Sequence, residues 1–220
     1  MMGLQLVRVV DEGGDSWVRL ELSDGLPTPV ANALRRAIIN EVPTMAVEEV
    51  LVIENSSAMP NEILAHRISL IPFVSDIDNY SLPEECTCGS KLGCERCVVR
   101  FVLRAAADTD TVTVYSRDIS PEKPDIKVAP VSGDFPIITL APGQRVELEL
   151  YVRLGKGRKH AKWQSGIATL YEENGRRYLY VESFGFLPAR RMVKEAVKII
   201  NQQVKELEQK LEEVMKNAEE

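Results

Sequence analysis

The sequence predicts an α+β protein in which antiparallel strands outnumber helices. Three observations support this class: residues 1–45 have the pattern of a β-hairpin and a helix, residues 46–165 are β-rich, and residues 166–220 return to a hairpin and a helix. Strands grouped in hairpins with few helices are typical of α+β domains. A chain of 220 residues is long enough for one large or two modest domains with a true core.

The first predicted elements are a hairpin over residues 4–22 and a helix over about 28–41. Apolar and polar residues alternate along the second strand, which is the pattern of a strand buried on one face. Thr28 is a suitable helix cap, Pro29 suits the first helical position, and Pro43 ends the helix. Apolar residues four apart predict its buried stripe: Val30, Leu34, Ile38 and Val42.

The middle of the chain predicts several strands around one short helix. This helix opens at Pro60 and ends against Pro72, which cannot continue it. The predicted strands cover residues 47–53, 98–106, 111–115, 137–139 and 146–154. Proline-rich turns separate them, and we expect this stretch to form a domain of its own.

The last third predicts a second hairpin and a long helix. The Asn174-Gly175 pair is a strong signal for a two-residue hairpin turn, and Pro188 opens the helix. Steps of four and three residues give a heptad row of apolar positions: Val193, Val197, Ile200, Val204, Leu207, Leu211 and Val214. A helix to about Asn217 would be roughly 43 Å long. We expect part of this row to need another chain, the alternative being a helix packed wholly within its own domain.

Composition and charge limit the class of protein. No segment approaches the 18 uncharged apolar residues of a membrane span, and the N-terminus lacks the pattern of a signal peptide, so we expect a soluble, cytoplasmic protein without membrane contact. The net charge of −6 disfavours broad nucleic-acid binding. A basic stretch from Arg153 to Lys162 is compatible with a contact to phosphate or to an acidic surface, or with a solvated loop.

All four cysteines lie in one short loop, residues 86–97. Their spacing is C-x-C-x5-C-x2-C, formed by Cys86, Cys88, Cys94 and Cys97. Two close pairs of thiolates are able to complete a tetrahedral zinc site with no open position, and such a site would be structural. The alternatives are disulfides or free thiols, and an iron–sulfur cluster, although the bacterial ferredoxin spacing is absent.

Residues suited to catalysis are not found in the sequence. His66 is expected to be packed or hydrogen-bonded on the short helix, and His160 lies in a basic loop far from any serine or acid that would form a triad. The acidic pairs at 76/78 and 108/110 lack a phosphate-binding loop beside them. A free-standing zinc enzyme would need an open coordination position and a general base. The residues therefore favour a scaffold.

Four ordered motifs then suggest a family. They are Asn32-Ala-Leu-Arg-Arg36, Glu41-Val-Pro-Thr-Met-Ala46, Ala65-His-Arg-Ile-Ser-Leu-Ile-Pro72 and Val181-Glu-Ser-Phe-Gly185. Together they resemble the D subunit of archaeal DNA-directed RNA polymerase, the homologue of the eukaryotic third-largest subunit and of the bacterial alpha N-terminal domain. The resemblance covers nearly the whole chain.

The resemblance implies a discontinuous dimerisation domain, residues 1–45 and 166–220, that carries an inserted β-rich domain, residues 46–165. It implies a heterodimer with the smaller subunit L, which nucleates assembly with subunits N and P and the large subunits. The expected partner-binding residues are Asn32, Arg35, Arg36, Val193, Val197, Ile200, Val204, Leu207 and Leu211. Arg35 and Arg36 are candidates for contacts to a large subunit.

The same resemblance limits the cofactor and the chemistry. The cysteine loop is similar to the zinc loop of the eukaryotic homologue, whereas the extra ferredoxin-like domain of some archaeal D subunits is missing, so an iron–sulfur cluster is not expected. Polymerisation would occur in the largest subunit, and any contact with DNA would be indirect. The remaining alternatives are a free-standing structural-zinc protein and a redox or iron–sulfur protein.

Overall fold

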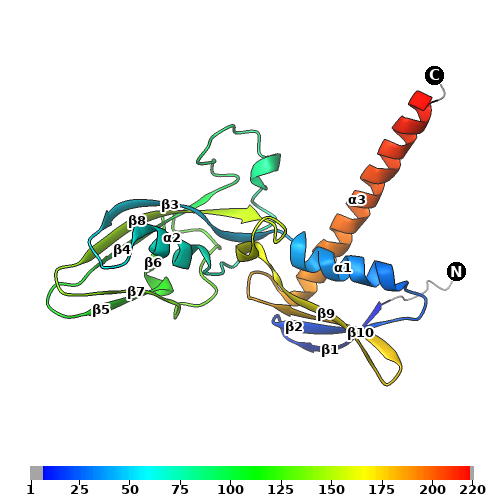
Figure 1. Ribbon diagram of the computed structural model, residues 1–220, viewed down its shortest axis with the longest axis horizontal. Coiled ribbons are helices and arrows are strands. Elements are labelled where there is room, and N and C mark those ends of the chain that lie inside the picture. Colours follow the sequence, from blue (N-terminus) through cyan, green and yellow to red (C-terminus); the bar gives the residue numbers. More distant parts are fainter. Residues whose placement is uncertain (1–6, 219–220) are drawn as a thin grey trace. The chain divides into compact units, whose positions relative to one another are not determined.

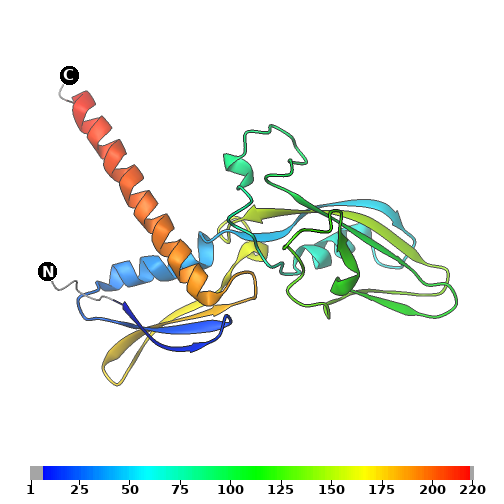
Figure 2. The ribbon, with the colours of Figure 1, turned by 180° about the vertical axis from the view of Figure 1, so that it is seen from behind.

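A computed structural model describes residues 7–218, and the chain divides into two compact units. Unit 1 combines Met1–Val42 with Ser165–Glu220, and unit 2 is Pro43–Gln164. Unit 2 is therefore inserted into the sequence of unit 1 (Figures 1 and 2). The boundaries expected from the sequence were residues 45/46 and 165/166.

Unit 1 contains a four-stranded antiparallel sheet in the order β1-β2-β10-β9. Its strands are β1 (Val7–Gly13), β2 (Trp17–Leu22), β9 (Gly166–Glu173) and β10 (Arg176–Ser183). Both predicted hairpins are present in the described residues, and residues 4–6 of the first prediction lie outside them. Asn174 and Gly175 have φ angles of 51° and 72°, and two positive φ values are what a type I′ turn requires.

Side chains alternate across this sheet. Val18 and Leu20 of β2, together with Leu179 and Val181 of β10, are buried, as the alternation in the sequence predicts. The opposite face carries aromatic and charged side chains, where Arg19 lies 4.1 Å from the centre of the Tyr178 ring.

Two helices belong to unit 1, α1 (Thr28–Asn40) and α3 (Ala189–Ala218), and α1 packs against both α3 and β9. The N-cap of α1 is Pro27, so the prediction that Thr28 caps the helix was wrong. Thr28 is instead the first helical residue, and its hydroxyl accepts a hydrogen bond from Arg177.

The buried face of α1 also differs from the prediction at one position. Val30 is 48% exposed, whereas Leu34 and Ile38 are buried as expected. Ala31 and Ala37 complete the buried face, since contact with α3 and β9 is centred one residue further along the helix than the predicted stripe.

Unit 2 contains a sheet in the order β3-β8-β4-β6 and a two-stranded sheet, β5-β7. Its strands are β3 (Thr44–Asn55), β4 (Val99–Ala106), β5 (Val112–Tyr115), β6 (Ile119–Pro121), β7 (Pro136–Leu140) and β8 (Arg145–Gly155). The short helix α2 (Asn61–Ser69) and three 3-10 helices, Pro83–Glu85, Ser116–Asp118 and Ala161–Trp163, complete it. The sequence predicts five of these strands and α2.

The core of unit 2 lies between α2 and the sheets. Leu64 and Ile68 of α2 are fully buried there, and the rings of Phe73 and Phe101 meet edge to face with their centroids 5.3 Å apart. The α+β class predicted from the sequence is thus confirmed in the described residues.

Candidate metal centre and candidate partner surface

The structure brings all four cysteine sulfurs together. Their Sγ atoms lie within 4.8 Å of one another, in the loop between α2 and β4 of unit 2. The closest pairs are Cys86 and Cys94 at 3.7 Å, Cys94 and Cys97 at 3.9 Å, and Cys88 and Cys97 at 4.0 Å. None of the four forms a disulfide.

These separations fit a metal ion held by four sulfurs. Four ligands at 2.3 Å from a central ion in a tetrahedron are about 3.8 Å apart. The three shortest sulfur distances lie close to that value and the others stay within 4.8 Å, so the donor set and its spacing suit a tetrahedral thiolate site. Four cysteines would leave no ligand position open for water or substrate.

The second cysteine pair is shaped by a tight backbone turn. The amides of Cys97 and Val98 both donate to the carbonyl of Cys94 at 2.9 Å, and the amide of Cys94 donates to Sγ of Cys97 at 3.2 Å. Gly93 precedes this turn with a φ of +82°, in the left-handed region that glycine adopts without strain. The local sequence therefore directs both sulfurs to one point.

The two sulfurs of this turn differ in acidity. The backbone amide of Arg96 lowers the pKa of Cys94 to about 6. Burial raises the pKa of Cys97 to about 12. A bound cation would favour the thiolate form of both sulfurs, because only deprotonated cysteines bind metal.

The loop is tied to the sheet of unit 2 at several points. Cys97 packs with Val98 against Tyr151 of β8, and Arg153 of the same strand donates to the carbonyl of Lys91 at 2.8 Å. The amide of Ser81 donates to the carbonyl of Arg96. These contacts connect the cysteine loop to β8 and to the segment that precedes the loop.

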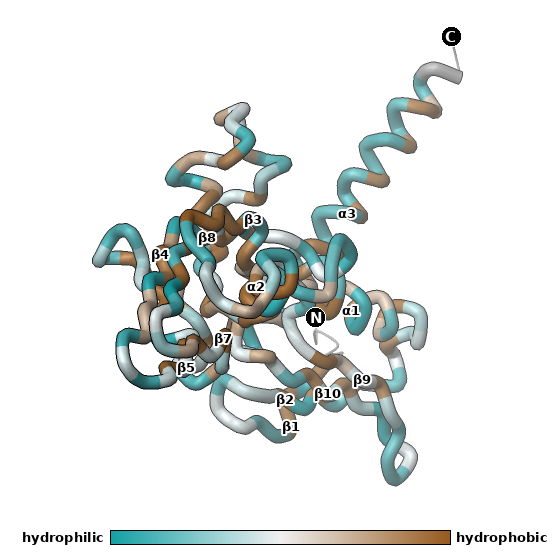
Figure 3. Tube along the Cα trace, turned by 60° about the vertical axis from the view of Figure 1, so that its left-hand side comes forward, coloured by the Kyte–Doolittle hydropathy of each residue, from teal (hydrophilic) through white to brown (hydrophobic). Residues whose placement is uncertain are grey.

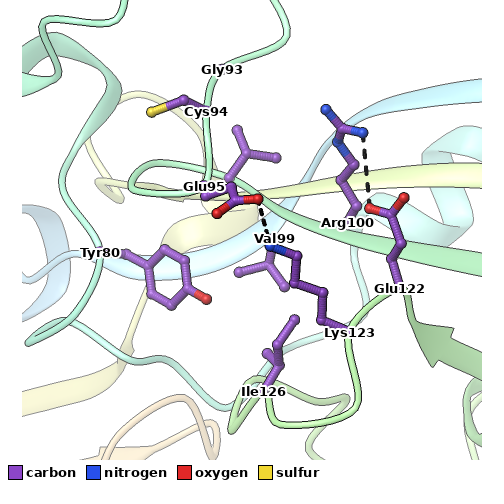
Figure 4. Close-up of a pocket in the computed structure, with 10 residues that line it drawn as sticks. Tyr80, Gly93, Cys94, Glu95, Val99, Arg100, Glu122, Lys123 and Ile126 are labelled. Atoms are coloured by element: carbon purple, nitrogen blue, oxygen red, sulfur yellow. Dashed lines mark hydrogen bonds and ion pairs between the residues drawn. The ribbon is translucent and has the colours of Figure 1, made fainter.

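A pocket of about 530 Å³ lies beside the cysteine loop (Figure 4). Tyr80, Val99 and Ile126 supply part of its lining. An ion pair between Glu95 and Lys123 joins the loop to the segment after β6, and the carboxylate of Glu122 lies 3.8 Å from Arg100. Polar and apolar side chains both line the pocket, and the Glu95–Lys123 pair connects the cysteine loop to the segment after β6.

The predicted apolar row on α3 is largely open to solvent. Ala189, Met192 and Ala196 are buried, but every described side chain from residue 201 to 216 is exposed. Val193 and Ile200 are half-buried, and four members of the row are 43–58% exposed: Val197, Val204, Leu207 and Leu211. Figure 3 shows apolar bands recurring along this polar helix. Within the described chain, nothing covers the part of the row beyond Ile200.

A groove of about 340 Å³ lies between α1 and α3 of unit 1, and the apolar row forms one of its sides. It is lined by Ala33, Arg36, Ala37 and Asn40 of α1, by Glu41 at the C-cap of that helix, and by Ile200, Gln203, Val204 and Leu207 of α3. Ala33 and Ala37 were not predicted from the sequence. Their four-residue spacing places two small side chains on one face of the helix, and this spacing in the sequence could have indicated a close helix contact there.

The three polar residues expected on α1 take different positions. Arg35 donates from Nε to Oδ1 of Asn32 at 3.0 Å, so these two side chains form a local pair. Arg36 is exposed and lines the groove. It makes no hydrogen bond or ion pair with any residue between 7 and 218.

The basic stretch from Arg153 to Lys162, which begins in the last residues of β8, forms ion pairs within unit 2. Lys162 contacts a carboxylate oxygen of Glu48 at 2.6 Å, Lys159 approaches the same side chain at 3.7 Å, and Arg153 lies 3.3 Å from Glu49. Lys162 also lies over the ring of Trp163. The sequence left open a contact to phosphate, a contact to an acidic surface and a solvated loop, and it did not predict these pairs with glutamates of unit 2.

The histidines and acidic residues that were considered for catalysis do not form a catalytic arrangement among residues 7–218. His66 is exposed on the side of α2 that faces away from Leu64 and Ile68. Its side chain makes no hydrogen bond among residues 7–218, so the expectation that it is packed or hydrogen-bonded was wrong. Nδ1 of His160 accepts the amide of Lys162 at 3.0 Å. Asp76 accepts three hydrogen bonds within its own turn.

Comparison with known proteins decides the family. Residues 49–170, more than half of the chain, match the family described as RNA polymerase Rpb3/RpoA insert domain. The chain belongs to this family. The resemblance to the archaeal D subunit that the motifs predicted is confirmed, and with it a fold like that of the bacterial alpha N-terminal domain.

Several relatives in the Rpb3/RpoA family carry the name DNA-directed RNA polymerase subunit Rpo3. The protein of Pyrobaculum neutrophilum is 45% identical over 148 residues, that of Methanosphaera stadtmanae 40% over 151, and that of Pyrococcus furiosus 39% over 167. These alignments cover 67%, 68% and 76% of this chain. They cover 55%, 54% and 58% of the relatives, so the chain spans little more than half of their length.

Among residues 7–218, no helix is both long enough and apolar enough to cross a bilayer.

Proposed function

We propose that this chain is a subunit of DNA-directed RNA polymerase that acts as an assembly scaffold without catalytic residues of its own. Unit 1 forms a heterodimer with the smaller subunit L, and this heterodimer then assembles with subunits N and P and the large subunits. Nucleotide polymerisation takes place in the large subunits, and the contact with DNA is indirect. The complex would work in the cytoplasm.

The uncovered apolar row on α3 carries this proposal. Val204, Leu207 and Leu211 are each about half exposed, which is costly for side chains of this size in water. The row borders the groove with α1, so a helix laid against α3 would contact both helices of unit 1. The names of the relatives in the Rpb3/RpoA family point to polymerase subunits as the source of that helix.

The arginine pair of α1 contributes a second kind of contact. Arg36 has no partner among residues 7–218 and is free to bind a carboxylate of another subunit. Arg35 is oriented by Asn32. We assign both arginines to contacts with a large subunit, and the apolar row from Val193 to Leu211 to subunit L.

The cysteine loop is proposed to hold one structural zinc ion. Four sulfurs at tetrahedral spacing, no open ligand position and a loop with little apolar material support zinc in a structural role. Metal analysis of the purified chain should give one zinc per molecule and no visible-range absorbance. A coloured protein containing iron and sulfide would refute the zinc assignment and revive the redox alternative.

The dimer is tested by charge substitution on α3. In a co-expression of this chain with subunit L, we expect the double variant Leu207→Glu/Leu211→Glu to weaken the heterodimer by at least tenfold, because each leucine loses its buried contact. Gln202→Glu/Gln209→Glu is the matched control, since both glutamines are exposed on the same helix and lie outside the row. Native mass spectrometry measures the fraction of heterodimer.

Two results would contradict the scaffold proposal. One is a heterodimer that is equally stable in both double variants, because the apolar row would then not be the interface. The other is a wild-type chain that remains a monomer in the presence of subunit L at micromolar concentration.

A further inference from the structure

The edge of β3 in unit 2 is closed along its first part and open along its second. β3 pairs with β8 on one side only. On the other side, the amide of Met45 donates to Oγ of Ser75 at 2.7 Å, and the carbonyl of Val47 accepts from Nζ of Lys162 at 3.0 Å. Met45 also forms an isolated bridge with Phe73. These contacts engage the amide of Met45 and the carbonyl of Val47, so the first part of the edge is covered by neighbouring segments.

The strand register shows which later groups face outward. Backbone groups of a strand alternate between its two edges, and a bulge resets the alternation by one residue. Val47 lies opposite Val152, and after the bulge at Glu48 the partners of Val50 and Val52 follow on β8 at two-residue steps. The N–H and C=O groups of Val50 and Val52 therefore point away from β8.

No described segment pairs with this second part of the edge. The isolated bridges of the described chain involve Met45, Phe73 and Pro130, and not residues 49–53. Leu51 and Ile53 flank the outward groups and are 50% and 53% exposed. An open edge with exposed apolar side chains is a template for pairing with a further strand.

The charges beside this edge are acidic. Glu54 follows the open segment, and Glu149 of β8 lies opposite Leu51. Glu149 accepts the hydroxyl of Tyr151, and neither glutamate forms an ion pair with another residue of the described chain. A second copy of the same edge would bring like charges together, which disfavours self-pairing.

We infer that the β3 edge between Glu49 and Ile53 binds an extended segment of a partner protein by strand addition. The segment pairs with the backbone of Val50 and Val52, places apolar side chains beside Leu51 and Ile53, and carries lysine or arginine near Glu54 and Glu149. This surface is separate from the groove between α1 and α3, and it does not depend on the polymerase assignment.

The test uses the full chain and two synthetic peptides. The first is Lys-Val-Thr-Val-Thr-Val-Lys, and its twin has glutamate in place of both lysines. We expect the basic peptide to slow hydrogen exchange at the amides of Val50 and Val52 at least tenfold at saturation. The acidic twin should bind at least tenfold more weakly, because it faces Glu54 and Glu149.

Two variants localise the binding. Leu51→Lys should weaken binding of the basic peptide at least tenfold, because it adds a positive charge and removes the apolar contact. Val112→Lys is the matched control, because Val112 is an exposed valine in the other sheet of unit 2. This variant should bind the basic peptide as tightly as the wild-type chain does. The double variant Glu54→Lys/Glu149→Lys should reverse the preference between the two peptides.

The inference is overturned by any of three results. These are unchanged exchange at Val50 and Val52, equal binding of the two peptides, and equal weakening by Leu51→Lys and Val112→Lys. No polymerase subunit enters the assay, so its outcome is independent of the heterodimer experiment.

Discussion

At the scale of single residues, Gly93 allows the turn that carries the second cysteine pair. Its φ is +82°, and an added Cβ would lie 2.2 Å from Cγ2 of Val98 and 3.1 Å from Sγ of Cys97. We expect Gly93→Ala to lower zinc affinity by about 10- to 100-fold, as loss of supporting contacts around a metal does. Competition with a chromophoric chelator measures this affinity.

Gly89 provides the matched control for that substitution. It also has a positive φ, +64°, but a Cβ there would meet nothing within 4 Å. Gly89→Ala should therefore show only the backbone cost of about 1–2 kcal/mol. Equal loss of zinc affinity in the two variants would mean that strain, and not the collision with Val98, disturbs the site.

Asp76 gives unit 2 a pH-dependent contribution to stability. Partial burial alone would raise the pKa of its carboxyl, but hydrogen bonds from Asn79 and from the amide of Asp78 outweigh burial and hold the pKa below its usual value. A lowered carboxyl pKa stabilises the fold above the unfolded value near 3.9, and this stabilisation is lost as the pH falls through the lower folded value.

The corresponding prediction concerns Asp76→Ala. At pH 7 it should reduce the free energy of unfolding by about 1 kcal/mol, and the difference from wild type should shrink below about pH 4. Denaturant titrations at pH 7 and pH 3 measure both values. Asp108→Ala, at an exposed turn position, should have no such effect. A difference that grows toward acid would contradict the assigned direction of the pKa.

At the scale of elements, Arg177 connects the second hairpin to the start of α1. From β10, its guanidinium donates to the carbonyls of Ser23 and Leu26 at 2.7 and 2.8 Å, and to the hydroxyl of Thr28 at 3.3 Å. Three acceptors on one planar group suit arginine and not lysine. The contact fixes the turn that leads from β2 into α1.

We expect Arg177→Ala to destabilise unit 1 by about 2 kcal/mol, because the two carbonyls lose a charged donor. Arg177→Lys should recover less than half of this loss. Hydrogen exchange of amides in β2 and β10 measures the effect in the intact chain. Arg176→Ala is the control: this neighbour is exposed and lies 3.4 Å from Glu21, and its loss should change stability by less than about 0.5 kcal/mol.

Sequence patterns predicted the longer elements well. The heptad steps from Val193 to Val214 predicted one continuous helix, and Asn174-Gly175 predicted a type I′ hairpin, because both signals are local and involve several residues. β6 and the 3-10 helices span three residues each, too few for any periodicity to appear.

Predictions from the sequence were weaker for features that tertiary packing determines. The cysteine spacing indicated a shared metal, but only the fold shows that Arg153 holds the loop through the carbonyl of Lys91. Glu48 and Glu49 pair with basic residues more than a hundred positions away, and no local pattern indicates such pairs. The buried face of α1 differs from the predicted one for the same reason, because packing against α3 and β9 determines which side chains of the helix are buried.

At the scale of the whole molecule, the two units should respond differently to removal of metal. A chelator should increase hydrogen exchange in residues 86–97 and in the neighbouring residues of β4 and β8, because the loop has little apolar material to order it. Amides of β2 and β10 in unit 1 should keep their exchange rates. If exchange rose equally in both units, the metal would stabilise the whole chain and not one loop.

The insertion of unit 2 into unit 1 has a consequence for synthesis on the ribosome. Trp17 of β2 pairs with Glu182 of β10, so the central strands of this sheet are translated more than 150 residues apart. At 5–20 residues per second, the first hairpin waits roughly ten to thirty seconds for its neighbour, while Pro43–Gln164 emerges in full. The nascent polypeptide must therefore protect an unfinished sheet edge in the meantime, and folding of the inserted segment is the first complete step available to it.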